Sequence, residues 1–157
     1  YEGGVRVPLL VRLPGITPPG SVCHRPVLST DFYQTILDVT GVEDDAERNH
    51  ELDGMSLLPL FKDPTAELKR DFLCWHYPHY YYGMNSPVGS IRQGDWKLLE
   101  YFEDGRLELY NLADDVSEEH ELSASQPDVA HRLRSQLRAW RRRVDAPMPT
   151  PNPNWKR

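Results

Sequence analysis

The residues best suited to chemistry lie in one segment, where a thiol and two imidazoles alternate with aromatic residues. Cys74, His76 and His79 have the spacing Cys-x-His-x-x-His, and four tyrosines lie within residues 77–82. Three interpretations are open. The group can bind zinc, although a structural zinc site needs four ligands and no second cluster is spaced to complete it. Its rings can pack at a sheet edge, or they can line a cleft for a polar substrate, because His and Tyr donate hydrogen bonds from an apolar backing. We favour the cleft.

Other reactive groups are sparse. The sequence has no G-x-S-x-G nucleophile elbow, no P-loop and no G-x-G-x-x-G. Arg6 and Arg12 alternate with apolar residues. Two interpretations are open: the arginines form ion pairs or face solvent, or they contact an anion. Cys23 and Cys74 are too few for a disulfide scaffold, and two free thiols or one bridge both remain open.

Composition narrows the classes of partner. The 157 residues carry a net charge of −6, and 39% are hydrophobic, so the chain can bury a core but has no dominant positive surface for nucleic acid. Charge is uneven, because residues 43–53 hold six acids and residues 132–143 hold six arginines without an acid. No run of 18 apolar residues occurs, so we expect neither a nucleic-acid partner nor a membrane span.

The first part of the chain predicts one strand and one helix. Residues 5–13 form a short apolar run with β-branched residues, typical of a buried strand. A helix is expected from Asp31 to Gly41, with Phe32, Ile36 and Leu37 packed against that strand. An exposed acidic loop over 42–54 follows, and then a short helical turn over 55–61 that is broken by Pro59.

The second part of the chain, from residue 65, has the sequence pattern of several short strands followed by one long helix. Strands are expected over 72–75, 90–92, 96–102 and 107–112, in an antiparallel sheet of three or four strands with a hairpin turn at Asp104-Gly105. A long helix follows Ser125, because Val129, Leu133, Leu137, Trp140 and Val144 form one apolar stripe. Residues 147–157 form an extended, proline-rich tail.

Several motifs resemble those of one enzyme family. They are Y-E-G-G-x-R-x-P at residues 1–8, L-D-G-x-S-L-L-P at 52–59, R-x-G-D-W-K at 92–97, and D-x-x-E followed by Leu at 115–122. In this order they resemble the C-terminal part of the formylglycine-dependent, arylsulfatase-like sulfatases of the alkaline-phosphatase superfamily. The resemblance implies that residues 1–64 form the last section of a large α/β domain, incomplete here. Residues 65–157 would form a small α+β C-terminal subdomain with a tail.

The resemblance also implies where catalysis occurs. Such enzymes use a formylglycine made from a C/S-x-P-x-R motif, which neither Cys23 nor Cys74 fits, and a Ca²⁺ held by Asp and Asn residues. In the family these groups and the catalytic lysines lie upstream, one lysine just before the position of Tyr1. We therefore expect no catalytic or metal residue in this chain, and no turnover by the chain alone.

The expected substrate is a sulfated carbohydrate or an aryl sulfate. In the sulfatases that this sequence resembles, the segment around His76 and His79 lies near the mouth of the active site, so both are predicted substrate-binding residues. The resemblance also implies a periplasmic or secreted enzyme. Two alternatives are a separate glycan- or protein-binding module, and part of a related phosphodiesterase or phosphonate hydrolase.

Overall fold

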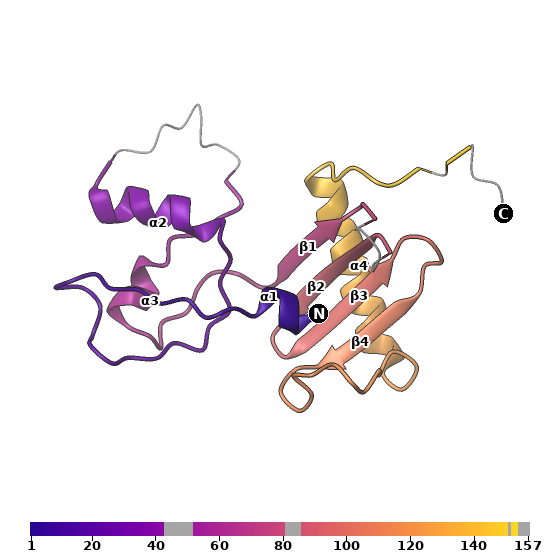
Figure 1. Cartoon of the computed structure of the whole chain (residues 1–157), viewed down its shortest axis with the longest axis horizontal. Helices are drawn as coiled ribbons and strands as arrows, with labels where there is room; N and C mark the ends of the chain where they lie inside the picture. Colours follow the sequence, from indigo (N-terminus) through magenta and orange to yellow (C-terminus); the bar gives the residue numbers. More distant parts are fainter. Residues whose placement is uncertain (43–51, 81–85, 151, 154–157) are drawn as a thin grey trace. The chain divides into compact units, whose positions relative to one another are not determined.

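The computed structural model describes residues 1–42, 52–80, 86–150 and 152–153, and the chain divides into two compact units (Figure 1). Unit 1 comprises Tyr1–Val7 and Arg70–Arg157, and unit 2 comprises Pro8–Lys69. Residues 1–7 thus group with the C-terminal part of the chain. The domain boundary at residue 64 stays a prediction, and most of the acidic loop expected over 42–54 lies outside the described residues.

Unit 1 is built on a four-stranded antiparallel sheet. Its strands are β1 (Leu73–Tyr77), β2 (Val88–Gln93), β3 (Trp96–Tyr101) and β4 (Leu107–Asn111), in that spatial order. Tight connections join the last three strands, and Gly94 and Gly105 take positive φ values of 59° and 72° that glycine adopts without strain. This confirms the predicted antiparallel sheet.

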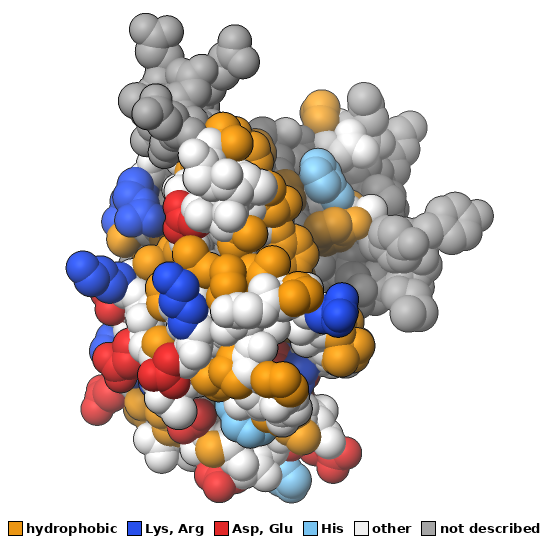
Figure 2. Space-filling model, turned by 90° about the vertical axis from the view of Figure 1, so that its left-hand side faces the viewer, with side chains coloured by type: hydrophobic (Ala, Val, Ile, Leu, Met, Phe, Trp, Pro, Cys, Tyr) orange, Lys and Arg blue, Asp and Glu red, His pale blue; other side chains and the backbone are white. Residues whose placement is uncertain are grey.

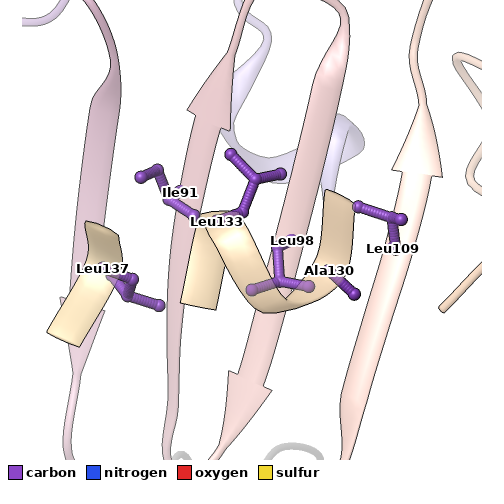
Figure 3. Packing of buried hydrophobic residues seen from close by; sticks show 6 residues of the cluster. All are labelled: Ile91, Leu98, Leu109, Ala130, Leu133 and Leu137. Atoms are coloured by element: carbon purple, nitrogen blue, oxygen red, sulfur yellow. The ribbon is translucent and has the colours of Figure 1, made fainter. Parts of the chain in front are cut away.

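One long helix, α4 (Pro127–Arg143), covers one face of this sheet. The predicted stripe forms the core, since Leu133 and Leu137 are fully buried against β2, β3 and β4. Figure 3 shows the interdigitating side chains, which are Ile91, Leu98, Leu109, Ala130, Leu133 and Leu137. Each buried leucine contributes about 1.5–3 kcal/mol. Local periodicity therefore suffices to specify this layer.

Unit 2 contains α2 (Asp31–Thr40) and α3 (Leu58–Lys62). Gly41 ends α2 in the left-handed conformation, as the sequence indicated. The buried side of α2 is polar: the Asp31 carboxylate accepts hydrogen bonds from the Met55 amide at 3.0 Å and the Leu28 amide at 2.8 Å. The Thr35 hydroxyl accepts one from the Leu57 amide at 2.9 Å. These bonds hold α2 against the segment that leads into α3.

Three expectations for the first part of the chain are wrong. Residues 6–13 form no strand, and Leu10 is 93% exposed. Phe32 and Ile36 are also exposed rather than packed on a strand. Pro59 lies in the first turn of α3, where proline needs no N–H partner, and so does not break it.

The missing strand has a physical reason. A strand is stable only when a neighbour satisfies its backbone groups and covers its apolar face, and the described part of unit 2 contains no other strand. The same unit leaves many apolar side chains exposed, namely Leu9, Leu10, Val11, Val22, Phe32, Tyr33, Ile36, Val42 and Leu52. Figure 2 shows how widely hydrophobic side chains cover the face in view. Unit 1 has its own core, whereas in the described part of unit 2 only Leu57 and Leu60 are buried hydrophobic residues.

Unit 1 also contains the short helix α1 (Glu2–Val5). Within the described ranges, no helix combines the length and apolarity needed to cross a membrane.

Candidate functional site

The two predicted substrate-binding histidines occupy different environments at one end of β1. His76 lies in β1 and pairs in register with Gly89 of β2, while His79 follows the strand. The His76 ring is half-buried, with its centroid 5.4 Å from that of Phe102, whereas His79 is exposed and meets the Tyr77 ring edge-on at 5.9 Å. The structure therefore places both on the same segment but separates their surroundings.

His76 is tied to the C-terminal tail. Its Nε2 lies 2.7 Å from the carbonyl oxygen of Pro147, and because a carbonyl only accepts, Nε2 carries the proton and donates. Its Nδ1 is buried without a hydrogen-bond partner in the described structure. His76 thus acts first as a packing and tail-holding residue, whereas the ring of His79 is accessible to a ligand.

The metal interpretations do not fit these residues. Within residues 1–42, 52–80, 86–150 and 152–153, no group of three or more His, Cys, Asp and Glu side chains could hold a metal ion. Cys74 and His76 point to the α4 side of the sheet, and His79 lies beyond the strand. The described residues therefore fit neither the zinc site considered from the spacing nor a calcium site. Tyr81 and Tyr82 lie outside the described residues.

The two cysteines are free and differ in access. Cys23 is exposed in unit 2, and Cys74 is half-buried against the core of unit 1. Burial raises the pKa of Cys74 to about 12, although the positive charges of Arg141 and Arg143 act in the opposite direction. Of the two possibilities left open by the sequence, the structure has two free thiols.

Thiol labelling should therefore distinguish the cysteines. In the folded chain we expect iodoacetamide to modify Cys23 at neutral pH, while Cys74 reacts on the order of a thousandfold more slowly because so little of it is thiolate. Peptide mass spectrometry of the labelled protein, with and without urea, measures both rates. Equal labelling of the two cysteines in the native protein would contradict this arrangement.

The arginine-rich helix contacts one buried carboxylate. Glu100 of β3, which is 3% exposed, accepts hydrogen bonds from Arg134 Nε at 2.7 Å, from Arg138 Nη2 at 2.6 Å and from Arg141 Nη2. Burial acts to raise the pKa of Glu100, but the three guanidinium hydrogen bonds outweigh it and lower the pKa. The arginine-rich run at residues 132–143 is thus partly a buried ion cluster.

Arg141 also packs between two elements at the His76 end of the sheet. Its guanidinium lies 5.1 Å from the centre of the Phe102 ring, in a cation–π arrangement. A Cβ on Gly89 would lie 3.1 Å from both Arg141 Nη1 and Phe102. A glycine at position 89 therefore permits this close approach.

A second charge cluster lies on the opposite face of the sheet. Lys97, which is 1% exposed, places its Nζ 2.9 Å from Oε1 of Glu2 and 2.9 Å from Oε1 of Glu118. Arg92 adds a contact of 3.4 Å to Glu2, and the Glu2 amide donates to Glu118. Arg6 lies 3.9 Å from Glu2, which favours the ion-pair interpretation of Arg6, while Arg12 is exposed.

Tyr1 is fixed beside this cluster. Its hydroxyl donates to Glu108 at 2.7 Å and lies 2.9 Å from the Tyr101 hydroxyl, and its ring meets Tyr110 edge-on at 6.3 Å. Burial and these neighbours raise the pKa of Tyr1. The two clusters were missed from the sequence, although Lys97 and Glu100 each share a strand face with apolar residues. Their partners are distant in sequence, so spacing gave no sign of the pairing.

Comparison with known proteins gives these features a context. A family model described as N-sulphoglucosamine sulphohydrolase, C-terminal, matches residues 1–143. A sulfatase of Formosa agariphila is 35% identical over 94% of this chain and 29% of its own length. Arylsulfatase K of Danio rerio is 31% identical over 88% of this chain and 26% of its own length. The chain thus spans less than a third of each relative.

Solved structures show the same fold. One, a complex with its substrate D-glucosamine-2-N,6-O-disulfate, has a TM-score of 0.59 at 24% identity, over 73% of this chain and 24% of that chain. A 2-O GAG sulfatase has a TM-score of 0.63 at 21% identity, over 74% and 25%. A phosphonate monoester hydrolase from Silicibacter pomeroyi has a TM-score of 0.61 at 24% identity, over 84% and 28%.

Proposed function

The chain belongs to the N-sulphoglucosamine sulphohydrolase C-terminal family, and we propose that it is the C-terminal part of a sulfatase that hydrolyses sulfate esters. The observation that carries the proposal is the family match over residues 1–143, together with 35% identity to a sulfatase over 94% of the chain. The confirmed sheet and covering helix support it, because sulfatase structures share them at TM-scores near 0.6.

The reacting groups of this enzyme are proposed to lie in another part of the protein. Neither Cys23 nor Cys74 is set in C/S-x-P-x-R, and the described residues do not fit a calcium site. No catalytic step is therefore assigned to this chain. Formylglycine and Ca²⁺ are proposed for the rest of the enzyme, and the role of this chain is to bind substrate and to support the fold.

The substrate is proposed to be a sulfated carbohydrate or an aryl sulfate. Two structural neighbours bind or act on sulfated sugars, one as a complex with a disulfated glucosamine and one as a GAG sulfatase. In this chain, the β1 end offers exposed rings at Tyr77, His79 and Tyr80, which suit the apolar faces and hydroxyls of a sugar. The location is proposed to be periplasmic or secreted.

The direct test is hydrolysis of 4-nitrophenyl sulfate. The intact protein containing this chain, produced with the maturation system that makes formylglycine, should release nitrophenolate, and the 157-residue chain alone should not. Absence of a C/S-x-P-x-R motif from the intact protein, or formylglycine-independent turnover by the chain alone, would contradict the proposal. A matched control is the intact protein with the formylglycine precursor replaced by alanine, which should be inactive.

A phosphonate ester hydrolase is the second candidate. The observation in its favour is the likeness to two phosphonate monoester hydrolases, with TM-scores of 0.61 and 0.53. Both lie below 25% identity and so show the fold alone. Comparison of kcat/KM for 4-nitrophenyl sulfate and for a 4-nitrophenyl phosphonate monoester in the intact protein decides between them, and we expect the sulfate to be the better substrate.

His79 and His76 are proposed to contact the substrate. Loss of a charge-assisted hydrogen bond from His79 to a sulfate oxygen should lower kcat/KM of the intact enzyme by about 10- to 150-fold in His79→Ala, with little change in Tm because the ring is exposed. His76→Ala should lower both activity and Tm, since His76 also holds Pro147 and packs on Phe102. Steady-state kinetics and thermal melts on each variant measure the two effects.

The two variants can be told apart because His76 is half-buried and hydrogen-bonded to Pro147, whereas His79 is exposed. If the His79 variant keeps kcat/KM within about twofold of wild type, the ring does not contact substrate. If the His76 variant loses stability but keeps the activity of its folded fraction, its role is structural only.

A further inference from the structure

The last turn of α4 carries exposed arginines with no role in the fold described so far. Arg142 and Arg143 are exposed, and neither guanidinium has a carboxylate partner within the residues that the structure describes. Arg141, between the buried cluster and these two, points inward to Glu100. Successive helical residues project about 100° apart, so Arg142 and Arg143 leave α4 in other directions than Arg141. Both are exposed, and Arg143 is near enough to Cys74 of β1 for its charge to act on that thiol.

This helix end lies close to the β1 segment that carries the two histidines. Pro147 is hydrogen-bonded to His76, and Pro147 is only four residues beyond Arg143. Four residues of extended chain span at most about 14 Å, so Arg143 lies within that reach of the Pro147–His76 contact. The Ala146 amide also bonds to the Arg141 carbonyl oxygen at 2.9 Å, which makes the connection shorter still. Figure 1 shows the last turn of α4 beside β1.

The charge at this end is positive in a chain whose net charge is −6. Three arginines of α4 surround Glu100, so that cluster has two guanidinium charges in excess. Arg142 and Arg143 add two more, while Asp145 and Glu103 are the acids nearby on the connecting segment and after β3. Cations also stabilise a helix C-terminus by about 0.3–1 kcal/mol, and Arg141, Arg142 and Arg143 all lie in the last turn of α4, so this contribution does not distinguish Arg142 and Arg143 from Arg141. The two outward arginines are available for an anion.

We propose that Arg142 and Arg143 form an accessory surface for a sulfated oligosaccharide, binding sulfate groups other than the one hydrolysed, next to the His76–Tyr80 segment. The inference rests on the proposed function, because it places the remainder of a sulfated chain beside the residues proposed to contact the reacting sugar. Guanidinium forks match sulfate oxygens, and the exposed rings of His79 and Tyr80 offer faces to the sugar. The surface is selective for long substrates, since a single aryl sulfate cannot reach both places.

The test compares substrates of two sizes in the intact protein. In Arg142→Gln/Arg143→Gln, KM for a heparin hexasaccharide, relative to KM for 4-nitrophenyl sulfate, should rise about fivefold, with kcat for the hexasaccharide unchanged. The effect should fade between about 0.1 M and 1 M salt, because exposed charge contacts are screened. The matched control is Lys62→Gln/Lys69→Gln, which removes the same charge at two exposed lysines elsewhere and should leave the KM ratio unchanged. An unchanged ratio in the Arg142/Arg143 variant, or an equal rise in the control, overturns the proposal.

Binding measured by calorimetry separates this inference from the proposed function. If the intact protein hydrolyses no sulfate ester but binds the hexasaccharide in a manner dependent on Arg142 and Arg143, the function fails and the surface stands. If hydrolysis occurs but binding is independent of the two arginines, the surface fails and the function stands. Equal arginine-dependent affinity for a DNA duplex would show a general polyanion surface and would overturn the assignment to sulfated sugar.

Discussion

Replacement of Lys97 by methionine is expected to lower the free energy of unfolding of the chain by about 3–5 kcal/mol. Lys97 is 1% exposed and sits between the carboxylates of Glu2 and Glu118, each 2.9 Å from its Nζ. Methionine has a similar length and fills the same space, so the loss reflects charge rather than a cavity. It leaves two carboxylates that are 4% and about 2% exposed, with Arg92 as the main remaining counter-charge.

Urea unfolding followed by tryptophan fluorescence measures this change, and Lys69→Met, at an exposed lysine, is the control. A triple variant, Glu2→Gln/Lys97→Met/Glu118→Gln, should recover much of the lost stability, because uncharged side chains no longer face one another as buried anions. If Lys97→Met lowers the free energy of unfolding no more than Lys69→Met does, the Lys97 cluster does not stabilise the fold. A triple variant that is less stable than Lys97→Met would lead to the same conclusion.

The same cluster bears on how the sulfatase fold is assembled. Tyr1 and Glu2 come first in the sequence, yet their hydroxyl and carboxylate are fixed on the outer face of a sheet made by residues 73–111. The resemblance places a catalytic lysine just before Tyr1. Under the proposed function, the cluster would therefore fix the chain next to the reacting groups, and Lys97→Met in the intact enzyme would affect activity through position.

The second part of the fold could be predicted because its signals are local. The alternation in residues 96–101 and 107–111 specifies which side chains face α4. The stripe of Val129, Leu133, Leu137 and Trp140 specifies the buried face of the helix, whereas Val144, its last predicted member, follows α4 and is exposed. The Asp104-Gly105 dipeptide is a strong signal for the turn of a β-hairpin. Each of these signals depends on near neighbours in sequence. The strands and the helix are confirmed, whereas residues 102–106, and not the predicted two-residue turn at Asp104-Gly105, connect β3 to β4.

The first part could not be predicted in the same way because its signals depend on absent neighbours. The apolar run over 5–13 has strand composition, but the pairing that makes a strand comes from another strand, and the described residues of unit 2 supply none. The apolar positions of α2 likewise remain exposed, and the polar Asp31 and Thr35 make its packing contacts. Composition therefore predicted a strand that does not form, because it carries no information about a pairing partner.

The candidate site shows the same division. The sequence singled out the His76–His79 segment, whose contact with substrate stays a prediction, but it ended the strand at residue 75, whereas β1 runs to Tyr77. It could not show that His76 donates to Pro147, 71 residues away. It could not show either that Arg134, Arg138 and Arg141 gather around Glu100, while Arg132 donates to Gln93 and the pair at 142–143 is exposed. Both facts follow from the packing of α4 across the sheet.

Replacement of Glu100 by glutamine is the other change with a large expected effect. Glu100 is 3% exposed and is the shared acceptor for Arg134, Arg138 and Arg141, so its loss leaves Arg141, 7% exposed, without its carboxylate. Glutamine keeps the volume and one acceptor oxygen but removes the charge. We expect the free energy of unfolding to fall by about 3 kcal/mol at neutral pH. Glu67→Gln, at an exposed carboxylate paired only with Arg25 at 3.5 Å, should change it little.

The pH dependence identifies charge as the cause. Because the folded state lowers the pKa of Glu100 below its ordinary value of 4.5, its contribution is fully present above about pH 4.5 and is lost as the pH falls through the lower folded value. The stability difference between wild type and Glu100→Gln should therefore be largest at neutral pH and shrink in acid. Urea midpoints measured from about pH 7 down to about pH 3 test this. A difference of constant size over that range would mean that shape, and not the carboxylate charge, holds the last turns of α4 on the sheet, and with them the arginines proposed to meet a sulfated chain.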